Sequence, residues 1–215
     1  MIRILYQMPD YIQRLYKGVV WRLTPSEKVI YLTFDDGPVP EVTPQVLEIL
    51  DKYNVKATFF MVGDNIRKYQ DLALQVMQRG HSVGNHTFNH LKGTKASDAG
   101  YFDNIHKTDV LLDKLHPAGT RRPHLLRPPY GKMRISQKRE LIKTHTVVLW
   151  DVITHDYNRD YPPEKVLKVV KRYSRQGSVV VFHDSIKASK NMLQVLPKAI
   201  EWWQEQGYTI RPILL

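Results

Sequence analysis

The sequence predicts a single α/β domain in which parallel strands alternate with helices and close into a barrel. Short apolar runs alternate with amphipathic stretches along the whole chain of 215 residues, which is the pattern of a β/α repeat. Strands joined through helices form right-handed crossovers and therefore a parallel sheet. Roughly 100 to 200 residues make one domain. Seven β/α units close more naturally into a barrel than they spread as an open sheet, so one barrel is expected.

The expected elements follow one another in strict alternation. Seven strands are expected, at residues 29–34, 57–62, 82–85, 125–127, 146–152, 178–182 and 208–213. Between them lie six amphipathic stretches that we expect to be helical, at residues 44–53, 71–79, 97–115, 136–143, 163–175 and 192–206. Gly80 and Gly207 directly follow two of these stretches, where glycine is a common helix stop.

Composition limits the chemistry that this chain can use. It contains no cysteine and has a formal net charge of +11. A disulfide framework, a thiolate nucleophile and a zinc–cysteine site are therefore excluded, and any metal must be held by histidine and carboxylate. The positive charge favours an anionic partner. It is scattered along the chain without a recognised nucleic-acid motif, so we expect a generally basic surface and no nucleic-acid partner.

The N-terminal region shows no recognisable targeting segment. Charged residues and a proline interrupt residues 1–20, and the sequence has no long apolar run. A membrane span needs about 18 or more consecutive apolar residues, so we expect neither a span nor a signal peptide. Tyr11, Leu15 and Val19 recur at helical spacing, and we expect them to pack along the barrel. The sequence leaves the oligomeric state and the cellular location open.

Reactive side chains concentrate where the expected strands end, which is where the active site of a β/α barrel gathers. Asp35 and Asp36 follow the first strand. They can form a solvated turn, or one carboxylate can bind a metal while its neighbour acts as a base. His86 and His90 follow the third strand. Their spacing of four would place both imidazoles on one side of a helical turn, where they can chelate one ion.

Three further strand ends carry such residues. Arg127 follows the fourth strand, Asp151 and Asp156 the fifth, and His183 the sixth. Each has a plain structural explanation by itself, such as an arginine that reaches solvent or a hydrogen-bonded core histidine. Five strand ends of this kind together favour one site. Two histidines and one carboxylate with an open position form a catalytic zinc arrangement.

At these residues the sequence resembles the polysaccharide deacetylase family, also called the NodB homology domain or carbohydrate esterase family 4. TFDDGP at residues 33–38 resembles the first family motif, and HTFNH at residues 86–90 resembles the second. RPPY at residues 127–130 resembles the third motif, and VFH at residues 181–183 the fifth. The resemblance runs from about Lys28 to the C-terminus. We therefore expect a deacetylase domain over residues 28–215 and an N-terminal extension over residues 1–27 that packs on it.

The resemblance implies a distorted (β/α)7 barrel, similar to a TIM barrel, as a single domain. It implies hydrolysis of acetyl groups from N-acetylated glycans such as chitooligosaccharides or peptidoglycan. It further implies that Asp36, His86 and His90 hold a divalent metal. Zn²⁺ is the preferred ion, with Co²⁺, Ni²⁺ or Mn²⁺ as alternatives.

The resemblance also implies catalytic roles. Asp35 would be the general base, steadied by Arg127, and His183 would be the general acid. Tyr130 would donate its backbone N–H to the oxyanion. Asp35 and His183 must then hold opposite protonation states, which predicts a bell-shaped pH profile. The residues that we expect to contact substrate are Tyr130, Tyr157 and Asp156.

The fourth motif departs from the family pattern. Members commonly show Asp-x-x-Asp-Trp, in which the first aspartate is expected to support the catalytic histidine, whereas ITHDY occupies residues 153–157 here. Ile153 cannot orient or charge-stabilise His183. Asp151 lies two residues earlier on the same strand face and is the candidate substitute. Val181 stands where leucine is usual, which could alter the fit of the pocket to an acetyl methyl group.

Two other functions stay open. The same metal, base and acid would serve an acetyl ester hydrolase that acts on xylan-like sugars. The altered fourth motif would also fit a catalytically impaired barrel that binds glycan without turnover. Nucleic-acid binding, which only the net charge suggests, is the least favoured reading.

Overall fold

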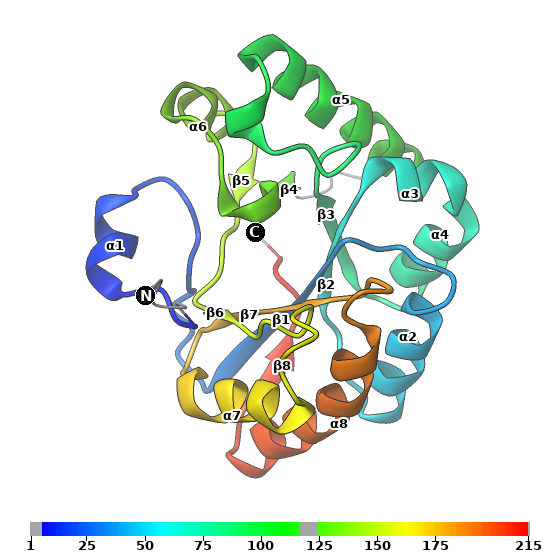
Figure 1. Cartoon of the computed structure of the whole chain (residues 1–215), viewed down its shortest axis with the longest axis vertical. Helices are drawn as coiled ribbons and strands as arrows, with labels where there is room; N and C mark the ends of the chain where they lie inside the picture. The colour runs from blue at the N-terminus through cyan, green and yellow to red at the C-terminus, as the bar shows by residue number, and fades with distance from the viewer. Residues whose placement is uncertain (1–5, 117–123, 215) are drawn as a thin grey trace.

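The computed structural model describes residues 6–116 and 124–214, and it has the expected barrel-like architecture (Figure 1). The strands form one parallel sheet in the order β5-β4-β3-β2-β1-β7-β6, with β8 beside β1. This confirms the prediction of a distorted β/α barrel in a single domain. The strands are β1 (Val29–Asp35), β2 (Thr58–Met61), β3 (Ser82–Asn85), β4 (Leu125–Leu126), β5 (Thr146–Val147), β6 (Val152–Ile153), β7 (Val179–His183) and β8 (Thr209–Arg211).

Strand β1 is the centre of the sheet. Its amino half pairs with β8 and its carboxyl half with β2, while β7 runs along the other side. The register places Asp35 opposite His183. Two residues 148 positions apart in the sequence therefore end neighbouring strands at the same level of the barrel.

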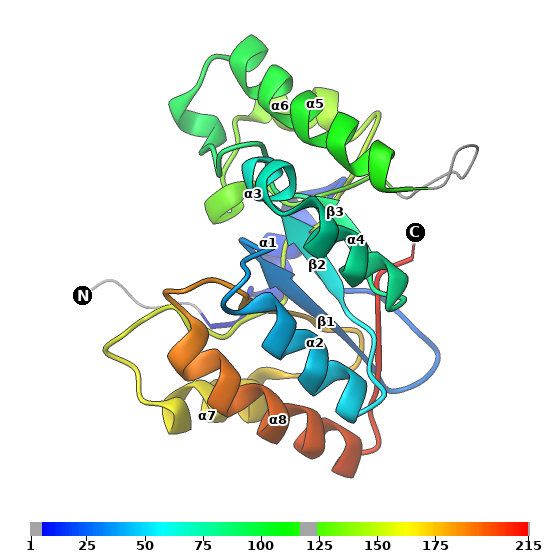
Figure 2. The same cartoon turned by 90° about the vertical axis from the view of Figure 1, so that its right-hand side faces the viewer.

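Helices surround the sheet on its outer side (Figures 1 and 2). No helix in the described part of the chain is long and apolar enough to cross a membrane. Helix α3 was not expected from the sequence, because six residues are too few to show a helical period. The helices are α1 (Asp10–Leu15), α2 (Thr43–Lys52), α3 (Gly63–Lys68), α4 (Gln70–Gln78), α5 (Asp98–Leu115), α6 (Ile135–Leu141), α7 (Pro163–Tyr173) and α8 (Ser189–Glu205).

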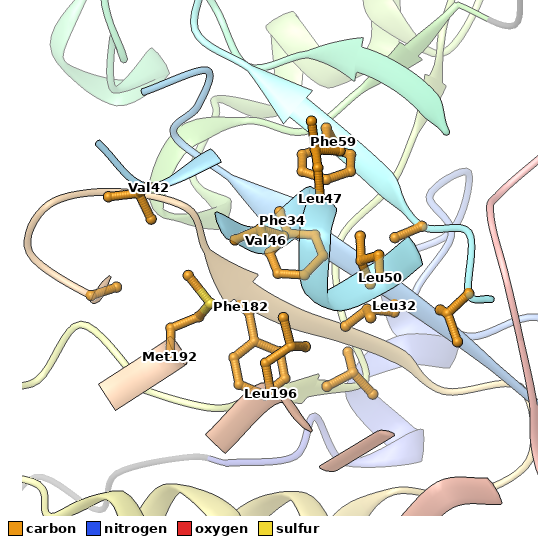
Figure 3. Packing of buried hydrophobic residues seen from close by; sticks show 14 of the residues in the cluster. Leu32, Phe34, Val42, Val46, Leu47, Leu50, Phe59, Phe182, Met192 and Leu196 are labelled. Carbon is orange, nitrogen blue, oxygen red and sulfur yellow. The ribbon is translucent and has the colours of Figure 1, made fainter. Parts of the chain in front are cut away.

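The largest apolar cluster lies between the sheet and the helices α2 and α8 (Figure 3). Leu32 and Phe34 of β1 point into this cluster, and the ring of Phe34 stacks on Phe59 at a centroid distance of 4.9 Å. Successive side chains of a strand alternate between its two faces. Thr33 and Asp35 consequently point into the barrel, where both accept hydrogen bonds from one guanidinium group.

The expected strand at residues 146–152 is wrong as a single element. Its beginning is β5, which pairs with β4, and its end is β6, which pairs with β7. Between them the chain turns to the N-terminal segment, where Leu149 N–H donates to the carbonyl of Val20 at 2.7 Å. A continuous apolar run cannot reveal that its two ends pair with different neighbours.

The N-terminal segment occupies the opening of the barrel between β5 and β6, which do not pair with each other in the part of the chain that is described. Isolated bridges join Gln7 to Val152 and Val20 to Val148. The expected apolar face does not form, because Tyr11 and Leu15 are 66% and 81% exposed. Val19 alone of the three packs against a buried cluster. Backbone hydrogen bonds and the side chains of Gln7 and Gln13, rather than an apolar helix face, join this segment to the barrel.

Candidate active site

A cavity of about 410 Å³ lies at the carboxyl ends of the strands. It collects residues from β1, β6 and β7 and from the loops that follow β1, β3, β4, β5, β6 and β7, as the barrel architecture predicts. Asp156 and Arg127, which were expected at this site, are not part of its lining. The lining residues are Asp35, Asp36, His86, His90, Tyr130, Trp150, Ile153, Tyr157, His183, Ser185 and Lys187.

Asp36, His86 and His90 form one group of potential metal ligands, with donor atoms that all lie within 4.8 Å of one another. Asp36 Oδ1 is 3.4 Å from His90 Nε2 and 3.8 Å from His86 Nε2. The Arg127 carbonyl lies 2.7 Å from His86 Nδ1 and accepts its proton when that nitrogen is protonated. Burial lowers the pKa of His86 to about 3. The ring is therefore neutral at pH 7, with Nε2 facing the other two ligands, and this donor set fits a divalent metal.

The two histidines are presented by a loop and not by the helical turn that their spacing suggested. Thr87 and His90 have positive φ angles of 62° and 56°, which ends any helical path between them. The Asn85 side chain accepts from Thr87 N–H at 2.7 Å, and Asn104 accepts from Phe88 N–H at 2.7 Å. The expectation of one shared helical face is wrong, although the predicted meeting of the two imidazoles is found.

Asp36 and Tyr130 also have left-handed backbones, with φ angles of 87° and 61°. Positive φ is uncommon outside glycine and asparagine, and such residues tend to cluster at functional sites. In Asp36 this conformation breaks the strand alternation, so the two neighbouring carboxylates Asp35 and Asp36 line the same cavity. That geometry could not be read from a strand pattern.

Asp35 is held by a buried guanidinium group. Arg127 Nη1 donates to Asp35 Oδ1 at 2.6 Å, and both side chains are buried. The other nitrogens of Arg127 donate to the carbonyls of Val148 and Leu149 at 3.2 and 3.0 Å. The guanidinium also lies 4.1 Å from the ring centroid of Phe60. Because the planar guanidinium of Arg127 is fixed by these contacts, its hydrogen bond holds the Asp35 carboxylate in one orientation. In this orientation Asp35 Oδ2 lies 4.0 Å from His86 Nε2.

His183 is held by Asp156, not by Asp151. Nδ1 of His183 donates to Asp156 Oδ1 at 2.8 Å, and the backbone N–H of His183 donates to Oδ2 at 2.8 Å. Burial alone would lower the pKa of His183, but the charge and hydrogen bond of Asp156, with help from Asp36 and Asp35, raise that pKa to about 9. Asp156 is only 1% exposed and does not line the cavity, so its predicted contact with substrate stays a prediction.

Asp151 lies elsewhere and cannot replace the missing aspartate of the fourth motif. Its carboxylate is buried and accepts hydrogen bonds from Arg175, Ser178 and Gln13. The proposed substitution by Asp151 is therefore wrong. The residue at the position of the second motif aspartate, Asp156, carries the role that we had given to the first.

Asp184 is a site residue that sequence reasoning missed. Its Oδ1 accepts from Gly37 N–H at 3.0 Å and its Oδ2 from the hydroxyl of Thr43 at 2.6 Å. A Cβ atom on Gly37 would lie 2.0 Å from Asp184 Oδ2, so only glycine fits there. Burial raises the pKa of Asp184 to about 8. These two hydrogen bonds hold the turn that follows Asp35 and Asp36. The signal for Asp184 in the sequence was its position directly after His183.

A second group of potential metal ligands comprises Asp109, His124 and His145. His124 and His145 directly precede β4 and β5, so this group is at the amino ends of the strands, opposite the cavity. His145 Nε2 lies 2.9 Å from Asp109 Oδ2, and Asp109 also accepts from Asn85 at 3.0 Å. These hydrogen bonds fasten α5 to the sheet.

The barrel and the carboxylate–histidine cavity together have the features of a metal-dependent deacetylase. The chain belongs to the polysaccharide deacetylase family, because residues 22–150 match the family model described as Polysaccharide deacetylase. It is 33% identical over 194 residues to a peptidoglycan-N-acetylglucosamine deacetylase of Bacillus cereus, covering 88% of each chain.

Two further comparisons agree with this membership. The chain is 33% identical to the peptidoglycan-N-acetylmuramic acid deacetylase PdaC of Bacillus subtilis, across 86% of this chain but only 38% of PdaC. The solved structure of the Bc1960 peptidoglycan N-acetylglucosamine deacetylase superimposes with a TM-score of 0.86 at 29% identity, covering 96% of this chain and 95% of that one.

Proposed function

We propose that this protein is a metal-dependent hydrolase that removes acetyl groups from N-acetylglucosamine-type glycans, such as chitin oligomers or peptidoglycan strands. One observation carries the proposal. A carboxylate held by arginine, a histidine held by a carboxylate and a three-residue ligand group all surround a single cavity. Amide hydrolysis requires a base, an acid and a group that polarises the carbonyl, and these three features can supply them.

Asp36, His86 and His90 would hold the divalent ion, with Zn²⁺ as the preferred metal and Co²⁺, Ni²⁺ or Mn²⁺ as alternatives. Two imidazoles and one carboxylate that leave a position open are a catalytic zinc set. When bound, such an ion supplies Lewis-acid chemistry, which polarises a carbonyl group and makes water a better nucleophile at neutral pH.

Asp35 would take a proton from the water that attacks the acetyl carbon. Its Oδ1 is occupied by Arg127, so Oδ2 is the oxygen available to accept that proton. The backbone N–H of Tyr130 would donate to the acetyl oxygen as negative charge develops on it. Loss of one such donor lowers rates by about a hundred- to a thousandfold in other hydrolases.

His183 would protonate the leaving nitrogen. An amine leaves poorly unless it is protonated, and a pKa of about 9 keeps His183 cationic at neutral pH. The hydrogen bond from Nδ1 to Asp156 leaves Nε2 as the nitrogen that delivers the proton. Because Asp156 supplies the support that the fourth motif had seemed to lack, an active enzyme is favoured over a barrel that binds glycan without turnover.

The aromatic residues at the cavity would contact the sugar. Tyr130 is exposed at the rim, with its ring 4.8 Å from that of His90. The ring of Tyr157 lies 4.9 Å from that of His183. Flat apolar rings at both sides of the reacting groups are suited to stacking on a pyranose.

An acetate ester of the same sugar is the informative comparison substrate. An alcohol leaves more readily than an amine, so the ester places less demand on His183. We expect the wild-type protein to release acetate from both an N-acetyl and an O-acetyl form, and His183→Ala to lose more activity on the amide than on the ester. Acetate release by the wild type from the ester alone would instead assign the protein as an O-deacetylase.

A further inference from the structure

A second cavity adjoins the proposed active site. It has a volume of about 610 Å³ and shares Lys187 with the catalytic cavity, so the two are neighbours. One wall is the loop that leads into α7, and the other is the beginning of α8 with the residues before it. Figure 2 shows that these two helices begin side by side. We call this cavity the basic pocket, and its charged lining residues are Arg159, Lys187, Lys190 and Asp160.

The basic pocket has three cationic side chains and one carboxylate among its lining residues. Within the described residues, no ion pair within 4.0 Å joins Arg159, Lys187 or Lys190 to a carboxylate. Lys187 Nζ instead lies 5.3 Å from the ring centroid of Tyr157, which is itself part of the catalytic cavity. Cations gathered in a concave surface attract anionic ligands.

The backbone adds to this charge. Pro163 begins α7 and Ser189 begins α8, and the basic pocket is lined by residues at both starts. The N-terminus of a helix carries a positive partial charge. The first turn of α8 contains no acidic residue, whereas that of α7 contains Glu164, so only the partial charge of α8 is left without an acidic side chain in its own first turn.

The wall of the basic pocket is fixed to the catalytic acid. Asn191, a buried lining residue, donates through Nδ2 to the carbonyls of Asp156, Asn158 and Tyr161 at 3.2, 3.3 and 3.0 Å. The same loop therefore carries the carboxylate that holds His183 and one side of the basic pocket. A ligand in this pocket would lie beside the site of proton delivery.

We propose that the basic pocket is a subsite for a sugar that carries a carboxylate, next to the sugar that loses its acetyl group. The inference rests on the proposed function and names its substrate class as an anionic glycan. N-acetylmuramic acid, with its lactyl carboxylate, is a sugar of this class. Neutral oligomers would fill the catalytic cavity without this added contact.

The test compares three tetrasaccharides. The first alternates N-acetylglucosamine and N-acetylmuramic acid, the second is the same glycan with its carboxylates converted to primary amides, and the third is the neutral N-acetylglucosamine tetramer. Acetate release gives kcat/KM for each. The wild type is expected to prefer the carboxylate form over the amide form by about tenfold in kcat/KM at low salt. Several exposed ion pairs between the pocket and the carboxylate would contribute, each raising kcat/KM by roughly fivefold or less. The preference should shrink as salt is added.

Two variants and a matched control decide the assignment. The double variant Arg159→Gln with Lys190→Gln changes only the basic pocket, and the triple variant with Lys187→Gln removes all three cations. The ratio of kcat/KM for the carboxylate form to that for the amide form is expected to fall stepwise toward one. Lys198→Gln is the control, since Lys198 is exposed on α8 outside both cavities and lies about two turns beyond Lys190. Equal rates on the carboxylate and amide forms in the wild type, or an equal loss in the control, would overturn the proposal.

A binding measurement separates failure of the subsite from failure of the proposed function. If the protein releases acetate from none of the three glycans, the proposed function fails. Calorimetric titration with the carboxylate and amide tetrasaccharides then decides the subsite by itself. Tighter binding of the carboxylate form that is lost in Arg159→Gln with Lys190→Gln supports the subsite, and equal binding of both forms rejects it.

Discussion

Replacing Asp35 by asparagine is expected to leave metal binding in place and to lower acetate release from an N-acetylglucosamine oligomer by a factor of about 10² to 10⁴. The amide can still accept the hydrogen bond from Arg127 but cannot take a proton from water. Asp35 is not one of the three grouped ligands, so the zinc content of the variant should match that of the wild type. Asp36→Asn is the matched control, because it changes the neighbouring carboxylate and is expected to weaken zinc binding itself.

Folding of the Asp35 variant must be measured with its rate. The substitution leaves the charge of Arg127 buried without its partner, and breaking a buried ion pair typically destabilises by about 3 to 5 kcal/mol. Thermal unfolding shows whether the assay temperature lies below the transition. The double variant Asp35→Asn with Arg127→Met removes both charges and is expected to regain part of the lost stability without regaining activity. A folded, zinc-loaded Asp35→Asn protein with wild-type rates would contradict the assignment of Asp35 as the base.

Replacing Asp156 by asparagine is expected to reduce activity by on the order of a hundredfold and to shift the alkaline limb of the pH–rate profile to lower pH. In the wild type the pKa of His183 is raised to about 9, so we expect the proposed acid to stay protonated, and activity to be maintained, up to that pH. Without the Asp156 carboxylate the burial of His183 dominates and its pKa falls. The variant should therefore lose activity at a pH where the wild type is still fully active.

Asp151→Asn is the control for this prediction. Asp151 is a buried aspartate on the same stretch of chain, but its partners are Arg175, Ser178 and Gln13. It is expected to lower the free energy of unfolding and to leave the pH profile unchanged. A shift of the alkaline limb in Asp151→Asn, with none in Asp156→Asn, would return the supporting role to Asp151.

The free energy of unfolding of the wild type should also depend on pH through the raised pKa of His183. The pKa of His183 is higher in the folded state than the ordinary value of 6.5. The His183–Asp156 pair therefore contributes its full stabilisation below about pH 6.5 and loses it as the pH rises toward 9. The difference in unfolding free energy between wild type and Asp156→Asn is accordingly expected to shrink between these values.

Much of the active site could be predicted because one rule of topology locates it. The carboxyl ends of parallel strands meet at one end of a barrel, so polar residues such as Asp36, His86 and His183 at these ends had to be neighbours. Hydrophobic periodicity located the strands well enough for that purpose. This rule brings together the strand ends that carry Asp36 and His86, but it does not give the loop conformation that brings His90 to them.

The contacts that the sequence left hidden are those set by irregular backbone. Strand alternation pointed to Asp151 as the partner of His183, but the chain bends before β6, and Asp156 reaches His183 across 27 positions of sequence. The left-handed conformations of Asp36 and His90 likewise have no signal in a periodic pattern. The split between β5 and β6 depends on the N-terminal segment, whose backbone hydrogen bonds to residues 147–153 leave no periodic side-chain pattern.

The most direct test of the proposed hydrolase is acetate release from an N-acetylglucosamine tetramer by metal-stripped protein, measured before and after addition of Zn²⁺. The roles given to Asp36, His86 and His90 predict no release from the stripped protein and restored release once one equivalent of zinc is bound. Undiminished release without metal would contradict the metal site. Zinc binding without any release would instead make this chain a glycan-binding barrel.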